Sequence, residues 1–88
     1  MRRNSLGEPR PETIAEIAAL MDELGLDAAE AQAEIFDCRD EPAPYTGWTA
    51  EISDSVTGEN RIFTCGFPNG AALMDALTDI GITLFVEP

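Results

Sequence analysis

Apolar residues in the first part of the chain recur at helical spacing. Between Glu12 and Leu24 they fall at positions i, i+3, i+4, i+7 and i+10, which places them along one face of a helix. Gly25 follows, and glycine commonly ends a helix by taking the left-handed conformation. The pattern therefore predicts a helix over residues 12–24. Its apolar face consists of Ile14, Ile17, Ala18, Met21 and Leu24.

A second helix is predicted from Ala28 to Cys38. Asp27 is a typical N-cap residue, and Glu30 three positions later completes a capping box. The prolines at 42 and 44 end helical structure, because a proline pushes the residue before it toward extended backbone. The apolar side of this helix consists of Ala28, Ala31, Ile35 and Cys38, with Phe36 beside it.

The period of the pattern changes to two in the second half of the chain. Trp48, Ala50 and Ile52 alternate with polar residues, as on a half-buried strand. A turn that contains glycine, at 56–60, separates this strand from a returning strand over 61–67. One side of the returning strand consists of Phe63, Cys65 and Phe67.

A third helix and a last strand complete the pattern. Asn69 is suited to cap a helix over 70–80, and Gly81 is suited to end it. Apolar residues then alternate over 82–86, which predicts a final strand.

The predicted order of elements, α-α-β-β-α-β, indicates an α+β fold. The hairpin strands pair antiparallel, and a helical crossover brings the last strand beside the first strand of the hairpin. This gives a small three-stranded antiparallel sheet of order 2-1-3 packed against helices. The proline and glycine in residues 1–10 predict a flexible arm before a single domain at 11–88. The expected core consists of Ile14, Ile17, Met21, Ile35, Trp48, Ile52, Leu73, Leu77 and Leu84.

The charge of the chain is strongly one-sided. Seventeen Asp and Glu residues stand against five Arg, for a net charge of -12, and there is no Lys or His. Such an excess makes the compact state repel itself, so a partner or an unusual solvent is needed to explain it. Its sign also disfavours contact with nucleic acid or an anionic membrane.

The side chains available argue against an enzyme. No His or Lys can act as a base near neutral pH, and a Cys nucleophile would lack its usual His activator. Cys38 and Cys65 alone cannot complete a common zinc site, so they are expected to be free thiols that pack as small apolar residues. The segment 54–59 lacks calcium-ligand spacing. We therefore expect no catalytic residue, cofactor or metal, and a cytoplasmic protein without a secretory signal or membrane span.

Acidic residues on the two predicted helices form rows that no basic residue at i+4 neutralises. On the second helix the spacings of three, four and three residues make one stripe, with steps of roughly 5 Å along the axis. This is slightly less than the phosphate spacing of a nucleic-acid strand. The rows predict a surface that binds a basic protein partner. The stripe is Asp27, Glu30, Glu34 and Asp37; Asp40 and Glu41 continue it, and the first helix adds Glu12, Glu16 and Glu23.

In size, acidity and α+β layout, residues 12–88 resemble phage-encoded small inhibitors of the anti-CRISPR and DNA-mimic type. The resemblance implies a non-enzymatic inhibitor that occupies a basic nucleic-acid channel of a host defence complex, in the host cytoplasm. The alternative is a regulatory or structural module whose acidic surface serves only solubility, as in a halophilic protein. Residues 47–54 resemble the first strand of HicB-like antitoxin domains, although the glycine-cysteine turn expected after it is missing.

Overall fold

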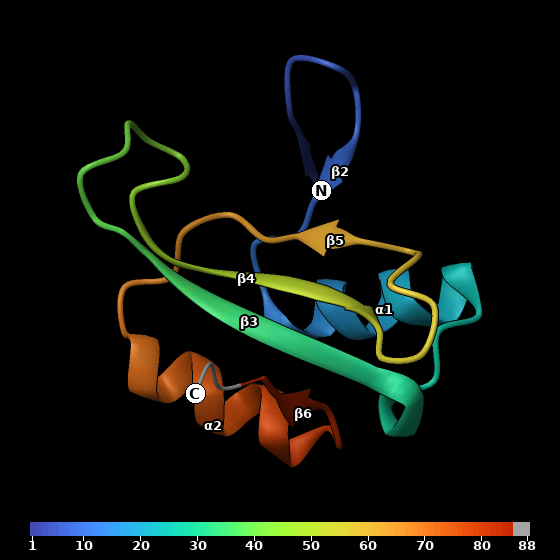
Figure 1. Cartoon of the computed structure of the whole chain (residues 1–88). Helices are drawn as coiled ribbons and strands as arrows, with labels where there is room; N and C mark the ends of the chain where they lie inside the picture. Colours follow the sequence, from blue (N-terminus) through green and yellow to red (C-terminus); the bar gives the residue numbers. More distant parts are fainter. Residues whose placement is uncertain (86–88) are drawn as a thin grey trace.

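The centre of the molecule is an antiparallel pair of long strands, β3 (Ala31–Cys38) and β4 (Gly47–Asp54) (Figure 1). The computed structural model describes residues 1–85. The two strands pair along their whole length, so that Ala33 lies opposite Ile52 and Ile35 lies opposite Ala50. These four residues therefore share one face of the sheet.

Two helices in the described residues, α1 (Ile14–Leu24) and α2 (Gly70–Asp79), confirm the predicted first and third helices. The side chains of Thr13 and Asn69 cap them, each by accepting a backbone N–H of the first turn. Gly25 ends α1 with φ 71°, a left-handed conformation that residues with a Cβ rarely adopt.

Two short strands flank the central pair and complete a sheet of order β5-β4-β3-β6. β5 (Ile62–Phe63) runs antiparallel to β4, and β6 (Thr83–Leu84) runs parallel to β3. The α+β class and the predicted antiparallel pairing of 48–53 with 61–67 are confirmed.

The predicted three-stranded antiparallel sheet of order 2-1-3 is wrong, because the sheet has a fourth strand and is mixed. β3 occupies the place beside β4 that the prediction assigns to the last strand. After α2 the chain therefore reaches the far side of β3, where β6 runs parallel to it. The predicted last strand covers 82–86, and Val86 lies outside the described residues.

The predicted second helix is also wrong. Helical structure in this segment is a single 3-10 turn over Ala28–Glu30, and β3 begins at the next residue. Asp27 does act as a cap, because its Oδ1 accepts the backbone N–H of Ala29 at 3.2 Å. The cap thus belongs to one turn that leads into a strand.

The residues of β3 fit two periods at once. Ala31 and Ile35 are four positions apart, as on a helix face, but with Ala33 between them they also alternate as on a strand. The partner strand decides between the two, since every residue of β3 has a residue of β4 opposite it. As a strand, the segment packs its apolar face on the two helices. A helix of this length would be only marginally stable by itself.

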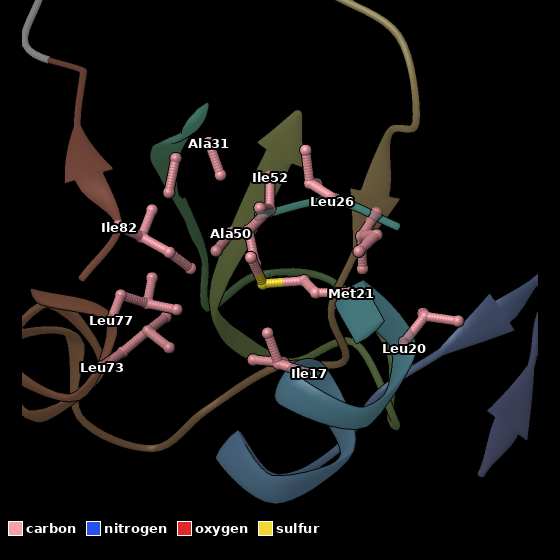
Figure 2. Packing of buried hydrophobic residues seen from close by; sticks show 12 residues of the cluster. Ile17, Leu20, Met21, Leu26, Ala31, Ala50, Ile52, Leu73, Leu77 and Ile82 are labelled. Carbon is pink, nitrogen blue, oxygen red and sulfur yellow. The ribbon is translucent and has the colours of Figure 1, made fainter. Parts of the chain in front are cut away.

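The hydrophobic core lies between the two helices and one face of the sheet (Figure 2). Five residues of the predicted core are buried: Ile17, Met21, Ile52, Leu73 and Leu77. The other four, which pack partly buried against that core, are Ile14, Ile35, Trp48 and Leu84. The rest of the buried cluster is Leu20, Leu26, Ala31, Ala33, Ala50, Ile62 and Ile82.

The N-terminal arm has regular structure. β1 (Arg2–Arg3) and β2 (Pro9–Arg10) form a short antiparallel ladder, and the chain then passes beside the strand edge, where the Cys65 N–H donates to Pro11 O at 2.8 Å. Whether the arm moves independently of a domain at 11–88 stays a prediction. Within residues 1–85, no helix has the length and apolar character needed to cross a membrane.

Candidate functional site

The sheet has a second face that neither described helix covers. Strand alternation sends every second side chain to this side, away from the core residues that contact α1 and α2. We call it the open face. Its residues are Gln32, Glu34, Phe36, Cys38, Thr49, Glu51, Ser53, Phe63, Thr83 and Phe85.

Large aromatic side chains lie on the open face. Phe36, Phe63 and Phe85 are 37%, 42% and 46% exposed, and they are three of the four phenylalanines in the chain. The uncovered side of a sheet normally carries polar residues. A group of exposed aromatic residues on such a surface is typical of a protein-binding site.

A hollow of about 400 Å³ lies at one end of the open face. The guanidinium carbon of Arg10 lies 4.0 Å from the ring centroid of Tyr45 and 6.0 Å from that of Phe63, and Arg10 also donates to the Thr64 carbonyl. The arm is thereby tied to the sheet by cation–π contacts. The hollow is lined by Arg10, Phe36, Asp37, Cys38, Glu41, Tyr45, Thr49 and Phe63.

A smaller hollow of about 210 Å³ lies at the other end. Phe85 is in its wall together with the carboxylates of Glu34 and Glu51. The Arg61 guanidinium lies 3.4 Å from a carboxylate oxygen of Glu51, so part of the negative charge here is paired within the chain. Both hollows therefore place phenylalanine beside carboxylates.

Asp37, at the rim of the larger hollow, is held by the next charged residue. Arg39 donates two side-chain hydrogen bonds to its carboxylate, at 2.8 and 2.7 Å. These bonds lower the pKa of Asp37 below its usual range and raise that of Arg39. The Arg39 guanidinium also lies 5.1 Å from the Trp48 ring centroid, so Asp37, Arg39 and Trp48 form one cluster at this rim.

The predicted acidic stripe is not formed, because its helix does not exist. Asp27 and Glu30 are at the 3-10 turn, while Glu34 and Asp37 are on β3, an odd number of positions apart and therefore on opposite sides of the strand. The regular spacing that resembles a row of phosphates is lost with the helix.

The other predicted partner-binding acids are divided between two places. Of the three acids predicted on the first helix, Glu12 accepts a hydrogen bond from Arg2, and Glu16 lies 3.8 Å from the N-terminal ammonium group. The arm therefore neutralises part of their charge. The third, Glu23, is exposed on α1. The residues Asp40 and Glu41 are exposed in the loop between β3 and β4. Three of the predicted residues thus lie on the open face or at its rim, Glu34 in the smaller hollow and Asp37 and Glu41 in the larger one.

The predicted helix over 28–38 conceals the aromatic part of this surface. Treating 31–38 as a helix puts Phe36 beside an apolar face and so hides its alternation with Glu34. The available signal is the period-two pattern Gln32, Glu34, Phe36, which places an aromatic residue on the polar side of a strand.

Other chemistry in the described residues is limited. No group of three or more Cys, Asp or Glu side chains in residues 1–85 is arranged to hold a metal ion. Asp54 accepts the N–H groups of Thr57 and Val56, which lowers its pKa and makes 54–59 a hydrogen-bonded turn. Cys38 and Cys65 are free thiols, and burial raises the pKa of Cys65, which disfavours the thiolate.

Comparison of the chain with protein-family models, with curated proteins and with solved structures finds no match. The chemistry of the surface is therefore what bears on function.

Proposed function

We propose that this protein is a non-enzymatic binding protein that docks its open face on a basic surface of a partner protein. The observation that carries the proposal is the exposure of Phe36, Phe63 and Phe85 among carboxylates on the uncovered side of the sheet. Protein interfaces commonly have an aromatic centre and a polar rim. Here carboxylates lie between the aromatic side chains as well as at the rim, because Glu34 and Glu51 face each other across β3 and β4, and this charge selects a basic partner.

The aromatic residues alone do not account for a stable complex. Burying what remains exposed of the three rings contributes about 6 kcal/mol, taking roughly 200 Å² per side chain and 25 cal/mol per Å². Association costs about 4–15 kcal/mol in lost freedom of motion. Charge pairing must therefore supply part of the affinity, and the net charge of -12 supplies it through fast, salt-dependent association.

A narrower form of the proposal makes the partner a nucleic-acid-binding protein. The negative field favours a surface rich in Lys and Arg, which such proteins use to hold phosphates. In this form the protein is an inhibitor of the anti-CRISPR or DNA-mimic type, encoded by a phage and active in the host cytoplasm. Size, acidity and fold class support it; an ordered row of carboxylates does not.

The test is capture of basic proteins from a cell lysate by the immobilised protein, at low and at high salt. The variant that removes two of the exposed aromatic side chains is Phe36→Ser with Phe85→Ser. Its matched control is Leu6→Ser with Val56→Ser, because these two apolar residues are 82% and 87% exposed but lie in the arm and in the β4–β5 turn. We expect the control to retain a partner that the open-face variant loses and that salt elutes.

Equal capture by the two variants would contradict the proposal and leave the alternative, in which the acidic surface serves only solubility. A captured partner also tests the narrower form. If that partner binds nucleic acid, adding this protein should displace the nucleic acid from it. A partner that keeps its nucleic acid while bound to the open face rules out mimicry.

A further inference from the structure

A second concave surface lies in the helix layer, where α1 and α2 both end. It has a volume of about 420 Å³. Its apolar lining includes Met21 and Leu26, whose side chains belong to the core, and Ile80, the C-cap residue of α2. The carboxylates of Asp22 and Asp27 are at its margin. We call this surface the helix-end groove.

The electrostatics of the helix-end groove are negative from two sources. The C-terminal end of a helix carries a partial negative charge, and both helices end here. The last turn of α1 contains Asp22 and Glu23, α2 ends at Asp79, and neither last turn contains a basic residue. Acids in these positions are unfavourable for the helices by roughly 0.3–1 kcal/mol each.

The placement of these acids therefore does not serve the stability of the helices. None of the described residues that line the helix-end groove is basic, so no Lys or Arg of the lining offsets the two carboxylates. An apolar floor with a negative margin fits the side chain of Lys or Arg, whose methylene stem packs on apolar surface while its charged end stays at the edge.

We propose that the helix-end groove binds a basic amphipathic segment of a protein. A Lys or Arg stem lies over Met21, Leu26 and Ile80, and its charged end meets Asp22 and Asp27. The site goes beyond the proposed function, because it is on the opposite side of the sheet from the open face. The two surfaces can be occupied at once, and one partner that reached both would gain affinity from bivalent contact.

The test uses a fluorescently labelled synthetic peptide of alternating Arg and Leu as the probe, with binding followed by anisotropy at low salt. Asp22→Asn and Glu23→Gln remove one carboxylate each from the same helix end, but only Asp22 lines the groove. We expect Asp22→Asn to weaken binding about tenfold, the loss of one charge-assisted contact. Glu23→Gln should weaken it less than about twofold.

A second pair of variants tests the shape of the groove without changing charge. Ala18 lines the helix-end groove, whereas the neighbouring Ala19 is exposed elsewhere on α1. Ala18→Phe should fill the groove and weaken binding about tenfold or more, while Ala19→Phe should bind like the parent. Circular dichroism melting checks that both variants keep the fold.

Chemical shifts of the backbone amides on adding the peptide locate the bound probe. Shifts centred on Gly25 and Ile80 support the proposal. Equal losses within each pair of variants, or no binding at all, overturn it. Shifts centred on Phe36 and Phe63 also overturn it, while leaving the open face as the binding surface and the proposed function intact.

Discussion

The two faces of the sheet differ in the exposure of their apolar side chains. On the covered face, Ala33, Ala50 and Ile52 are fully buried, and two of these three are the small residue alanine. On the open face, Phe36 and Phe85 remain 37% and 46% exposed. The apolar side chains that stay well exposed are thus phenylalanines of the open face, whereas large side chains of the covered face such as Ile35 and Trp48 pack partly buried against the core.

This difference separates the side chains that the fold needs for packing from those that it does not need. Helices that pack closely on a sheet leave little room, so alanine suits the covered face, and the helices supply the volume through their own leucine and isoleucine side chains. The exposed phenylalanines contribute little to that packing. They are therefore available for a partner, and four predictions test the contrast.

The largest effect is expected on the covered face at Ile17, which is fully buried. Ile17→Asp puts an unpaired carboxylate into the core and should unfold the domain or destabilise it by about 3–5 kcal/mol. Urea denaturation measures the loss in the free energy of unfolding, with Ala19→Asp on the exposed side of the same helix as the control. An Ile17→Asp protein as stable as this control would mean that the α1 face is wrongly assigned.

An intermediate effect is expected when an alanine of the covered face is enlarged. Ala50→Leu should cost about 1–3 kcal/mol, because the added atoms have no space between the sheet and the helices. The free energy of unfolding from denaturant melts measures it. A neutral or stabilising result would show that the covered face is loosely packed, and the comparison with the open face would fail.

Salt and pH should act on the surface charges and leave the covered face unaffected. Salt screens the self-repulsion, and protonation of some carboxylates near pH 5 reduces it, so the melting temperature should rise with salt and be higher near pH 5 than near pH 8.

Below about pH 4 the trend should reverse. Asp37 and Asp54 have lowered pKa values in the folded state, so their stabilising contribution is present above the unfolded pKa and is lost as the pH falls through the folded one. Arg39→Gln removes the partner of Asp37, so it should reduce the stability that is lost in acid. A melting temperature that does not respond to salt would indicate that the carboxylates are satisfied locally.

The smallest effect on stability is expected on the open face. Phe85→Ser alone should destabilise the fold by only about 1 kcal/mol, because this ring is 46% exposed and loses only part of the buried area of a core side chain. Thermal melting of the variant beside the parent measures this. A loss larger than that of Ala50→Leu would mean that this ring holds the fold together and is not reserved for a partner.

Local signals were sufficient for α1 and α2. Both have apolar residues at helical spacing, and Gly25 and Asn69 mark ends that the structure confirms. The segment 31–38 lacked such a decisive signal, because its apolar residues fit a helix and a strand equally well. Only its pairing with β4, from residues further along the chain, selects the strand.

The candidate site shows the same division. The sequence identified an acidic chain and the carboxylates of Glu34, Asp37 and Glu41, because charge is visible in composition. It did not bring Phe36 together with Phe85, which are far apart in sequence and reach one face only through the sheet order. An exposed patch depends on which elements are neighbours.

By itself, the sequence determined the two helices, the antiparallel hairpin that ends the central sheet, most of the core and the strong negative charge. These follow from periodicity, caps and composition, which act within short stretches of chain. Tertiary structure alone decided that 31–38 is a strand, that β6 pairs with β3, and that one face of the sheet stays uncovered. The reason is that strand pairing joins distant segments, so its free energy depends on partner strands that no local sequence pattern identifies.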